Sequence, residues 1–152
     1  MHRKILLFVA LILLGLIGNY LKVPFIFGVD VIFGSIATLL AVAILGTIPG
    51  TFAGLIIGGM TWFLWDHPYA MITFGAEALF VGLVYKNPRN LALVDGLFWM
   101  LIGVPLVFIF YSGILDLNFN VSSVIATKQA LNGVMNAVAV ALILIALNFY
   151  GK

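Results

Sequence analysis

The sequence predicts an all-α membrane protein, a bundle of six transmembrane helices, and three observations support this fold class. Apolar residues make up 64% of the 152 residues and charged residues only 8%, whereas ordinary globular domains are about a quarter charged. Apolar stretches long enough to cross a bilayer recur along the chain, separated by short breaks that contain proline, glycine or charge. The basic residues gather in breaks that one topology places on the same side of a membrane.

The six predicted spans together form one domain, residues 1–152. They cover residues 4–21, 31–45, 49–65, 69–85, 91–111 and 123–150. The third span begins at Pro49, because proline suits the first turn of a helix, where its missing N–H donor is not needed. We interpret the first apolar run as a retained helix, since no small-residue cleavage site follows it; a cleaved signal peptide is the alternative.

The charged residues predict the orientation of this bundle. With the N-terminus in the cytoplasm, six alternating spans bring most basic residues to the inner side, namely Arg3, Lys4, Lys86, Arg89 and Lys152. The acidic residues Asp66 and Asp116 fall outside. The positive-inside rule therefore predicts a multi-pass membrane protein with both termini in the cytoplasm. A five-span chain would place some of these basic residues outside and fits less well.

The segment between the first two predicted spans, residues 23–30, is apolar but too short to cross the bilayer. Pro24 and Gly28 disfavour a helix there, and irregular backbone is tolerated at membrane depth only where protein or a wet cavity covers it. We therefore expect a partly buried apolar loop over the outer mouth of the bundle. An ordinary loop at the membrane surface is the alternative.

The third predicted span carries glycine at every fourth position, at Gly50, Gly54 and Gly58. This spacing gives one smooth helix face, and in lipid such faces allow two helix backbones to approach closely. We expect this face to pack on a neighbouring helix of the same bundle. A contact between two copies of the chain in a homodimer is the alternative.

Ionisable and amide side chains within the predicted spans indicate a functional site, because polar groups at this depth are costly unless they have partners. Glu77 lies near the middle of the fourth span. Lys128, Asn132 and Asn136 share one face of the last span, and Gln129 lies beside them. We expect these side chains to line one ligand-binding cavity. A structural seam of hydrogen bonds between two helices is the alternative.

Aromatic side chains would form the walls of such a cavity, as in most small-molecule sites. The expected wall residues are Trp62, Trp65, Phe74 and Trp99. Asp30 is a candidate for the outer mouth of the cavity. Asp95, near the start of the fifth span, is interpreted as an acid that interacts favourably with the positive end of the helix dipole.

No enzymatic activity, metal site or cofactor is predicted. The chain has no cysteine, and Asp66 with His67 would supply too few ligands for a metal ion. The sequence carries no Ser-His-Asp set, phosphate-binding glycine loop or HExxH pattern. The net charge of +2 is too small and too scattered to predict nucleic-acid binding.

Four short motifs resemble the N-terminal membrane sensor regions of bacterial signalling proteins of the histidine kinase and GGDEF type. They are FGVDVIFGSIA at 27–37, WDHPYA at 65–70, EALFVG at 77–82 and KQALNG at 128–133. The resemblance implies a module that passes a ligand-dependent movement of the last helix to a cytoplasmic output domain, in the same chain or in a partner protein. A kinase or diguanylate cyclase output would imply a homodimer.

The layout of six short helices with an apolar loop after the first also resembles the substrate-binding S components of energy-coupling-factor vitamin transporters. Those components commonly carry an Ala-x-x-x-Ala-like patch on the first helix, whereas this chain has Ala10, Gly15 and Gly18 there. We therefore expect a membrane-embedded sensor of an unidentified small molecule. The alternatives are a solute-binding transporter component and a structural membrane subunit of the envelope.

Overall fold

The computed structural model describes residues 2–24 and 30–150. The structure is 87% helical, and within the described residues it has six helices, which confirms the predicted all-α class. The fifth helix is composite, because its hydrogen-bonding pattern changes several times along its length. In chain order the helical elements are α1 (His2–Tyr20), α2 (Gly34–Leu45), α3 (Thr47–Trp65), α4 (Tyr69–Val84), η2 (Pro88–Asn90), α5 (Leu91–Phe98), η3 (Trp99–Gly103), α6 (Val104–Val107), η4 (Phe108–Ile114) and α7 (Phe119–Tyr150).

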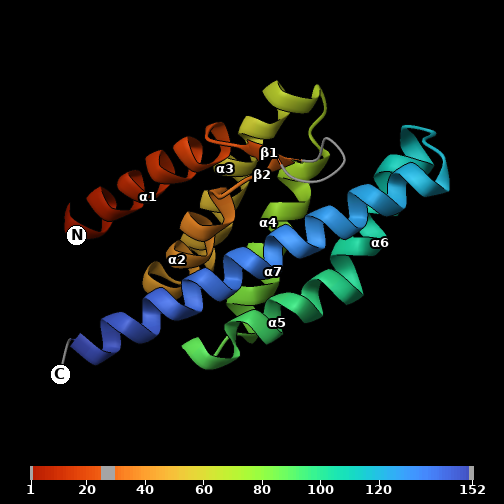
Figure 1. Ribbon diagram of the computed structural model, residues 1–152. Coiled ribbons are helices and arrows are strands. Elements are labelled where there is room, and N and C mark those ends of the chain that lie inside the picture. Colours follow the sequence, from red (N-terminus) through yellow and green to blue (C-terminus); the bar gives the residue numbers. More distant parts are fainter. Residues whose placement is uncertain (1, 25–29, 151–152) are drawn as a thin grey trace.

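The helices pack in two neighbouring groups (Figure 1). α1 lies at one edge and contacts α2 and α3, while α7 lies beside α5 and α6 on the other side. α4 packs on α3 and also contacts α5, so it joins the two groups. The two ends of the described chain lie on the same side of the molecule (Figure 1).

Four of these helical segments are long and apolar enough to cross a membrane. They are His2–Tyr20, Thr47–Trp65, Pro88–Ile114 and Phe119–Asn148. The apolar helices α2 and α4 have only 12 and 16 residues. At 1.5 Å per residue they are about 18 and 24 Å long, shorter than a hydrocarbon core of about 30 Å. Length and composition thus support a membrane protein with four full-length spans. The same criteria do not make α2 and α4 long enough to count as spans.

The largest difference from the predicted boundaries is at the last helix, which begins at Phe119 rather than at residue 123. Polar residues had suggested a loop up to residue 122, but they stabilise the start of the helix instead. The Asn118 side chain accepts a hydrogen bond from the Val121 backbone N–H at 2.9 Å. The Ser122 and Ser112 hydroxyls are hydrogen-bonded at 2.8 Å and join α7 to the end of the fifth helix.

The connection between α1 and α2 contains a small antiparallel pair of strands, β1 (Val23–Pro24) and β2 (Asp30–Val31). Lys22 and Asp30 form an ion pair of 2.8 Å beside it. The predicted apolar loop over the bundle included residues 25–29, which lie outside the described residues. The two-residue strands are a local departure from an otherwise helical chain.

The fifth helix contains two π-helical segments, η3 and η4, which the sequence reading did not anticipate. Pro105 provides a physical reason for the first. Its ring has no N–H, and it displaces the carbonyl four residues earlier, which belongs to Leu101 inside η3. Wider turns of this kind are rare in proteins, and those that do occur are often found at functional sites.

Close packing at glycine and one buried amide hold the first three helices together. The Asn19 side chain donates to the Ile57 carbonyl at 3.0 Å and accepts from the Gly34 N–H at 2.9 Å. On α3, the glycine face meets α2 and α4. A methyl group added at Gly54 would lie 2.9 Å from the Phe74 carbonyl oxygen. Glycine therefore occupies the positions at which these helix backbones come closest.

Candidate functional site

Glu77 lies on α4 and is completely buried. Its Oε1 accepts a hydrogen bond of 2.9 Å from the Trp99 indole Nε1, and its Oε2 accepts one of 3.3 Å from the Ser35 hydroxyl. Ser35 belongs to α2 and Trp99 begins η3. One carboxyl group therefore joins three separate helices in the interior.

Asp95, on α5, is also completely buried, and its carboxyl is a neighbour of the Glu77 carboxyl. Within the described part of the chain, no N–H or O–H group donates to either Asp95 oxygen. Two neighbouring carboxyl groups can hydrogen-bond to each other only when one of them carries a proton. The two acids therefore form a buried carboxyl pair without a basic partner among the described residues.

The interpretation of Asp95 as a helix-dipole acid was wrong, because its side chain is in the core rather than at an exposed helix end. It is the fifth residue of α5 and lies one turn before Trp99. That spacing of four places Asp95 and Trp99 on the same face of the helix. The spacing was visible in the sequence, but it did not show that this face meets Glu77.

Asn132 and Asn136 of α7 bind the backbone of Ile32, between β2 and α2. The Asn132 side chain accepts from the Ile32 N–H at 3.1 Å and donates to the Ile32 carbonyl at 3.0 Å. Asn136 donates to the same carbonyl at 3.0 Å. The two amides thus hydrogen-bond the buried N–H and C=O groups of Ile32, as a neighbouring strand would, and they fix the start of α2.

Gly133 brings α7 directly against the Glu77–Trp99 hydrogen bond. A methyl group on Gly133 would overlap the Trp99 Nε1 and would lie 2.9 Å from the Glu77 Oε1. Glu77 therefore lies beside the turn of α7 that carries Asn132. The two asparagines reach the acid only indirectly, because Ile32 is three residues before Ser35.

The predicted site residues near the start of α4 form a separate group. The Lys128 Nζ lies 5.1 Å from the centre of the Trp65 ring, in a cation–π contact. The Gln129 side chain is buried next to the Tyr111 hydroxyl, and Asp30 pairs with Lys22. These residues are not brought into contact with the Glu77 carboxyl.

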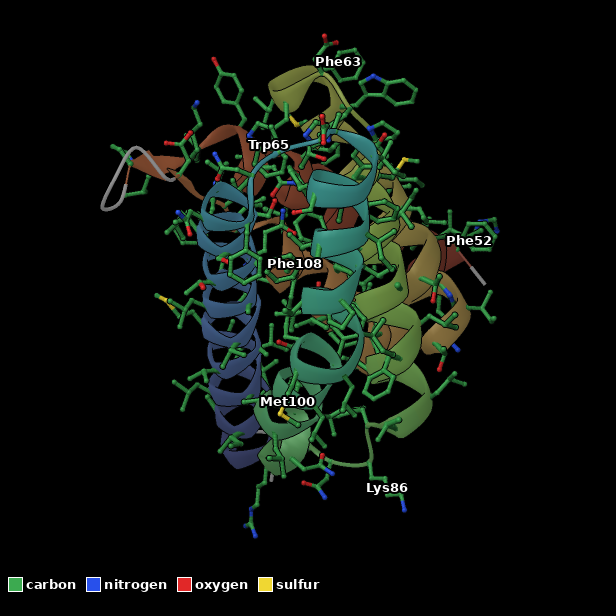
Figure 2. The ribbon with its side chains drawn as sticks, turned by 90° about the vertical axis from the view of Figure 1, so that its right-hand side faces the viewer. Phe52, Phe63, Trp65, Lys86, Met100 and Phe108 are labelled. Atoms are coloured by element: carbon green, nitrogen blue, oxygen red, sulfur yellow. The ribbon has the colours of Figure 1, made fainter. Side chains whose placement is uncertain are left out.

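The remaining predicted wall residues have different surroundings. Phe74 is buried in the core beside Phe98 and Trp99. Trp62 is half exposed and lines a surface cavity of about 520 Å³ together with Phe63 and Asp66. Figure 2 shows Phe63 and Trp65 at the end of the molecule opposite Lys86. Of the four predicted aromatic walls, only Trp99 donates a hydrogen bond to Glu77.

The cluster of Glu77, Asp95, Trp99, Ser35 and Gly133 can hold a proton or another small cationic group between two acids. It can also transmit a change in their charge to α2, α5 and α7, because each of these helices touches the pair. Across residues 2–24 and 30–150, no three acidic or histidine side chains are grouped as a metal site would require.

Comparison with known proteins gives no relative from which a function could be transferred. No protein-family model, no curated protein and no solved structure matches this chain. The functional argument therefore depends on the buried cluster and on the helices that form it.

Proposed function

We propose that this chain is a membrane-embedded sensor module that crosses the bacterial inner membrane six times and passes a ligand-dependent movement of α7 to a cytoplasmic output domain. The observation that carries the proposal is the buried carboxyl pair of Glu77 and Asp95, in which Glu77 packs against the backbone of α7 at Gly133. Ionisable side chains inside a membrane bundle are costly, and they usually serve a function.

The shape of α7 supports a role in transmission. It has 32 residues and is about 48 Å long, which exceeds the thickness of a hydrocarbon core. Its middle contacts the acid pair, and its end reaches the side of the molecule where both described chain ends lie (Figure 1). A shift or rotation at Gly133 would therefore be carried along one rigid element to the membrane surface.

The π-helical segment η3 supports a local source of movement. Trp99 donates to Glu77 from the first position of η3. We infer that this wide turn can return to regular α-helical hydrogen bonding when the chain shifts by one residue. A change in the charge of the acid pair would alter the acceptor of the Trp99 N–H and so favour one arrangement of this helix over the other.

The six-span topology is part of the same proposal. α2 and α4 are short, and we infer that they cross with the help of the connections at their ends and a locally thinner bilayer. The position of both described chain ends on one side supports an even number of crossings (Figure 1).

The proposal is tested with Glu77→Gln and Asp95→Asn, with Asp66→Asn as the matched control at an exposed acid. A small-molecule library is screened by thermal unfolding of the detergent-solubilised chain. We expect compounds that stabilise the wild type and Asp66→Asn to lose their effect on both core variants. Spin labels at Leu83 and Leu147, both exposed, should then report a changed distance on ligand binding.

Unchanged ligand-induced stabilisation in both core variants would contradict a sensor site at the acid pair. Binding that depends on the pair but leaves the distance between labels unchanged would instead favour the solute-binding transporter component.

A further inference from the structure

α1 is attached to the rest of the bundle mainly through its second half. Its buried residues are Leu11, Gly15 and Asn19, whereas residues 2–7 are all exposed. A methyl group on Gly15 would overlap the Ile57 side chain, which shows how closely α1 and α3 approach at that point. In the first half of α1, Phe8 still packs against the core cluster that includes Ala53 and Ile57 of α3, but the exposed residues before it bury little surface.

An apolar groove of about 450 Å³ occupies the resulting space between α1, the end of α2 and the start of α3. Its lining includes Lys4, Ile5, Phe8, Leu45, Phe52 and Ile56. Phe52 is 57% exposed, and Figure 2 shows it at the outer margin of the bundle. The groove therefore opens on the outer surface of the bundle.

The lining determines the chemistry of an occupant. Every lining residue is apolar except Lys4, and none is acidic. The groove would hold a hydrocarbon chain along its length and an anionic group at its Lys4 end. α1 and α3 are both long and apolar enough to cross a membrane, so the surrounding bilayer is the direct source of such a molecule.

We propose that this groove binds one acyl chain of an anionic phospholipid, whose phosphate is paired with Lys4. Basic residues next to gaps between membrane helices recognise anionic head groups in this way. The acyl chain supplies the packing contacts that the exposed residues at the start of α1 do not obtain from α3. The bound lipid thereby fixes the angle between α1 and the rest of the bundle.

The test is native mass spectrometry of the whole chain after titration with phosphatidylglycerol or phosphatidylcholine. Ile5→Trp fills the groove, and Leu13→Trp is its control on the exposed face of the same helix. Lys4→Gln removes the proposed phosphate partner, and Arg3→Gln is its control at the adjacent position, outside the lining. Thermal unfolding of each variant in detergent verifies that it is folded.

We expect the wild type to retain one phosphatidylglycerol in preference to phosphatidylcholine. Ile5→Trp should abolish this retention, and Lys4→Gln should weaken it about fivefold, the value of one lysine at an anionic lipid surface. Leu13→Trp and Arg3→Gln should bind as the wild type does. Equal retention of the two lipids, or full retention by folded Ile5→Trp, would overturn the proposal. So would a disulfide between two copies of a Phe52→Cys variant, since a second copy would then occupy the groove.

Discussion

At the scale of single residues, Gly133 sets how closely α7 approaches the buried acids. Its backbone lies against the Trp99 indole and the Glu77 carboxyl, at a point where any side chain would collide with both. Gly96, on α5, provides a natural comparison. A methyl group added there would meet only Val134 at an ordinary 3.9 Å.

Gly133→Ala is expected to lower the free energy of unfolding by about 1–3 kcal/mol, the usual cost of an oversized side chain in a packed interior. Gly96→Ala should be neutral or stabilising by up to about 1 kcal/mol, since alanine favours a helix more than glycine does. Both are measured by chemical unfolding in detergent, followed by tryptophan fluorescence. Equal stabilities of the two variants would show that α7 does not press on the Glu77–Trp99 hydrogen bond.

At the same scale, His67 lies in the connection between α3 and α4. Its ring is half-buried and lies 5.1 Å from the Tyr69 ring and 5.1 Å from the Tyr111 ring. Burial lowers the pKa of the His67 imidazole from 6.5, and the neighbouring charge of Asp66 offsets only part of this. The folded chain therefore favours the neutral ring.

This lowered pKa predicts a pH dependence of stability. The unfolded chain takes up a proton near pH 6.5 while the folded chain resists it, so stability is greatest above that pH and decreases as the pH falls below it. Unfolding is measured between pH about 7.5 and 5.5, above the range in which exposed carboxyls titrate. His67→Gln should reduce the decrease, and His2→Gln at the exposed start of α1 should not. A decrease that persists unchanged in His67→Gln would assign it to another group.

At the scale of elements, the glycine face of α3 determines how α2, α3 and α4 pack. Gly50 approaches Val42 of α2, and Gly58 approaches Met71 of α4. Gly54, between them, meets both helices at once. Leu55, on the same helix, packs against Gly75 of α4.

Gly54→Ala should lower the unfolding free energy by about 1–3 kcal/mol, because the Phe74 carbonyl at 2.9 Å and the Thr38 methyl at 3.1 Å leave no room for a side chain. Gly59→Ala is the matched control, since a methyl group there meets only the Met71 sulfur at 3.5 Å. Thermal unfolding in detergent compares the two. If Gly59→Ala were the more damaging change, α3 would have to present a different face to α4.

At the scale of the whole molecule, aromatic and charged residues separate toward opposite ends of the bundle. Phe63 and Trp65 lie at the end opposite Lys86 (Figure 2). The connections that contain Asp66 and Asp116 both have a residue with positive φ, at 58° and 55°. Aspartate adopts this conformation more readily than most residues, and both side chains are exposed.

Cysteines introduced at Asp66 and Asp116 are expected to react with an impermeant thiol reagent in intact cells, whereas one at Asn87 should react only after the membrane is opened. The expectation follows from the positive-inside rule and the basic residues beside Asn87. The chain has no cysteine of its own, so each label reports a single position. Labelling of Asn87→Cys in intact cells would contradict the proposed orientation.

The sequence by itself determined the all-α class, the apolar character expected of a membrane protein, and the helix ends to within a few residues. Those features depend on local signals. An apolar composition favours lipid over water, and Pro, Gly and charged residues interrupt helices wherever they occur. The burial of Glu77 followed for the same reason, since an acid in the middle of an apolar helix is costly at a lipid-facing position.

Only the tertiary structure decided which polar groups meet. Asp95 lies beside Glu77, and Asn132 binds the backbone of Ile32, one hundred positions away along the chain. In a soluble helix, the alternation of apolar and polar residues shows which face is buried. Here nearly every face is apolar, because lipid accepts the same side chains as the core does. The rotation of each helix, and with it the partners of its few polar residues, is therefore set by packing between helices that the sequence pattern does not reveal.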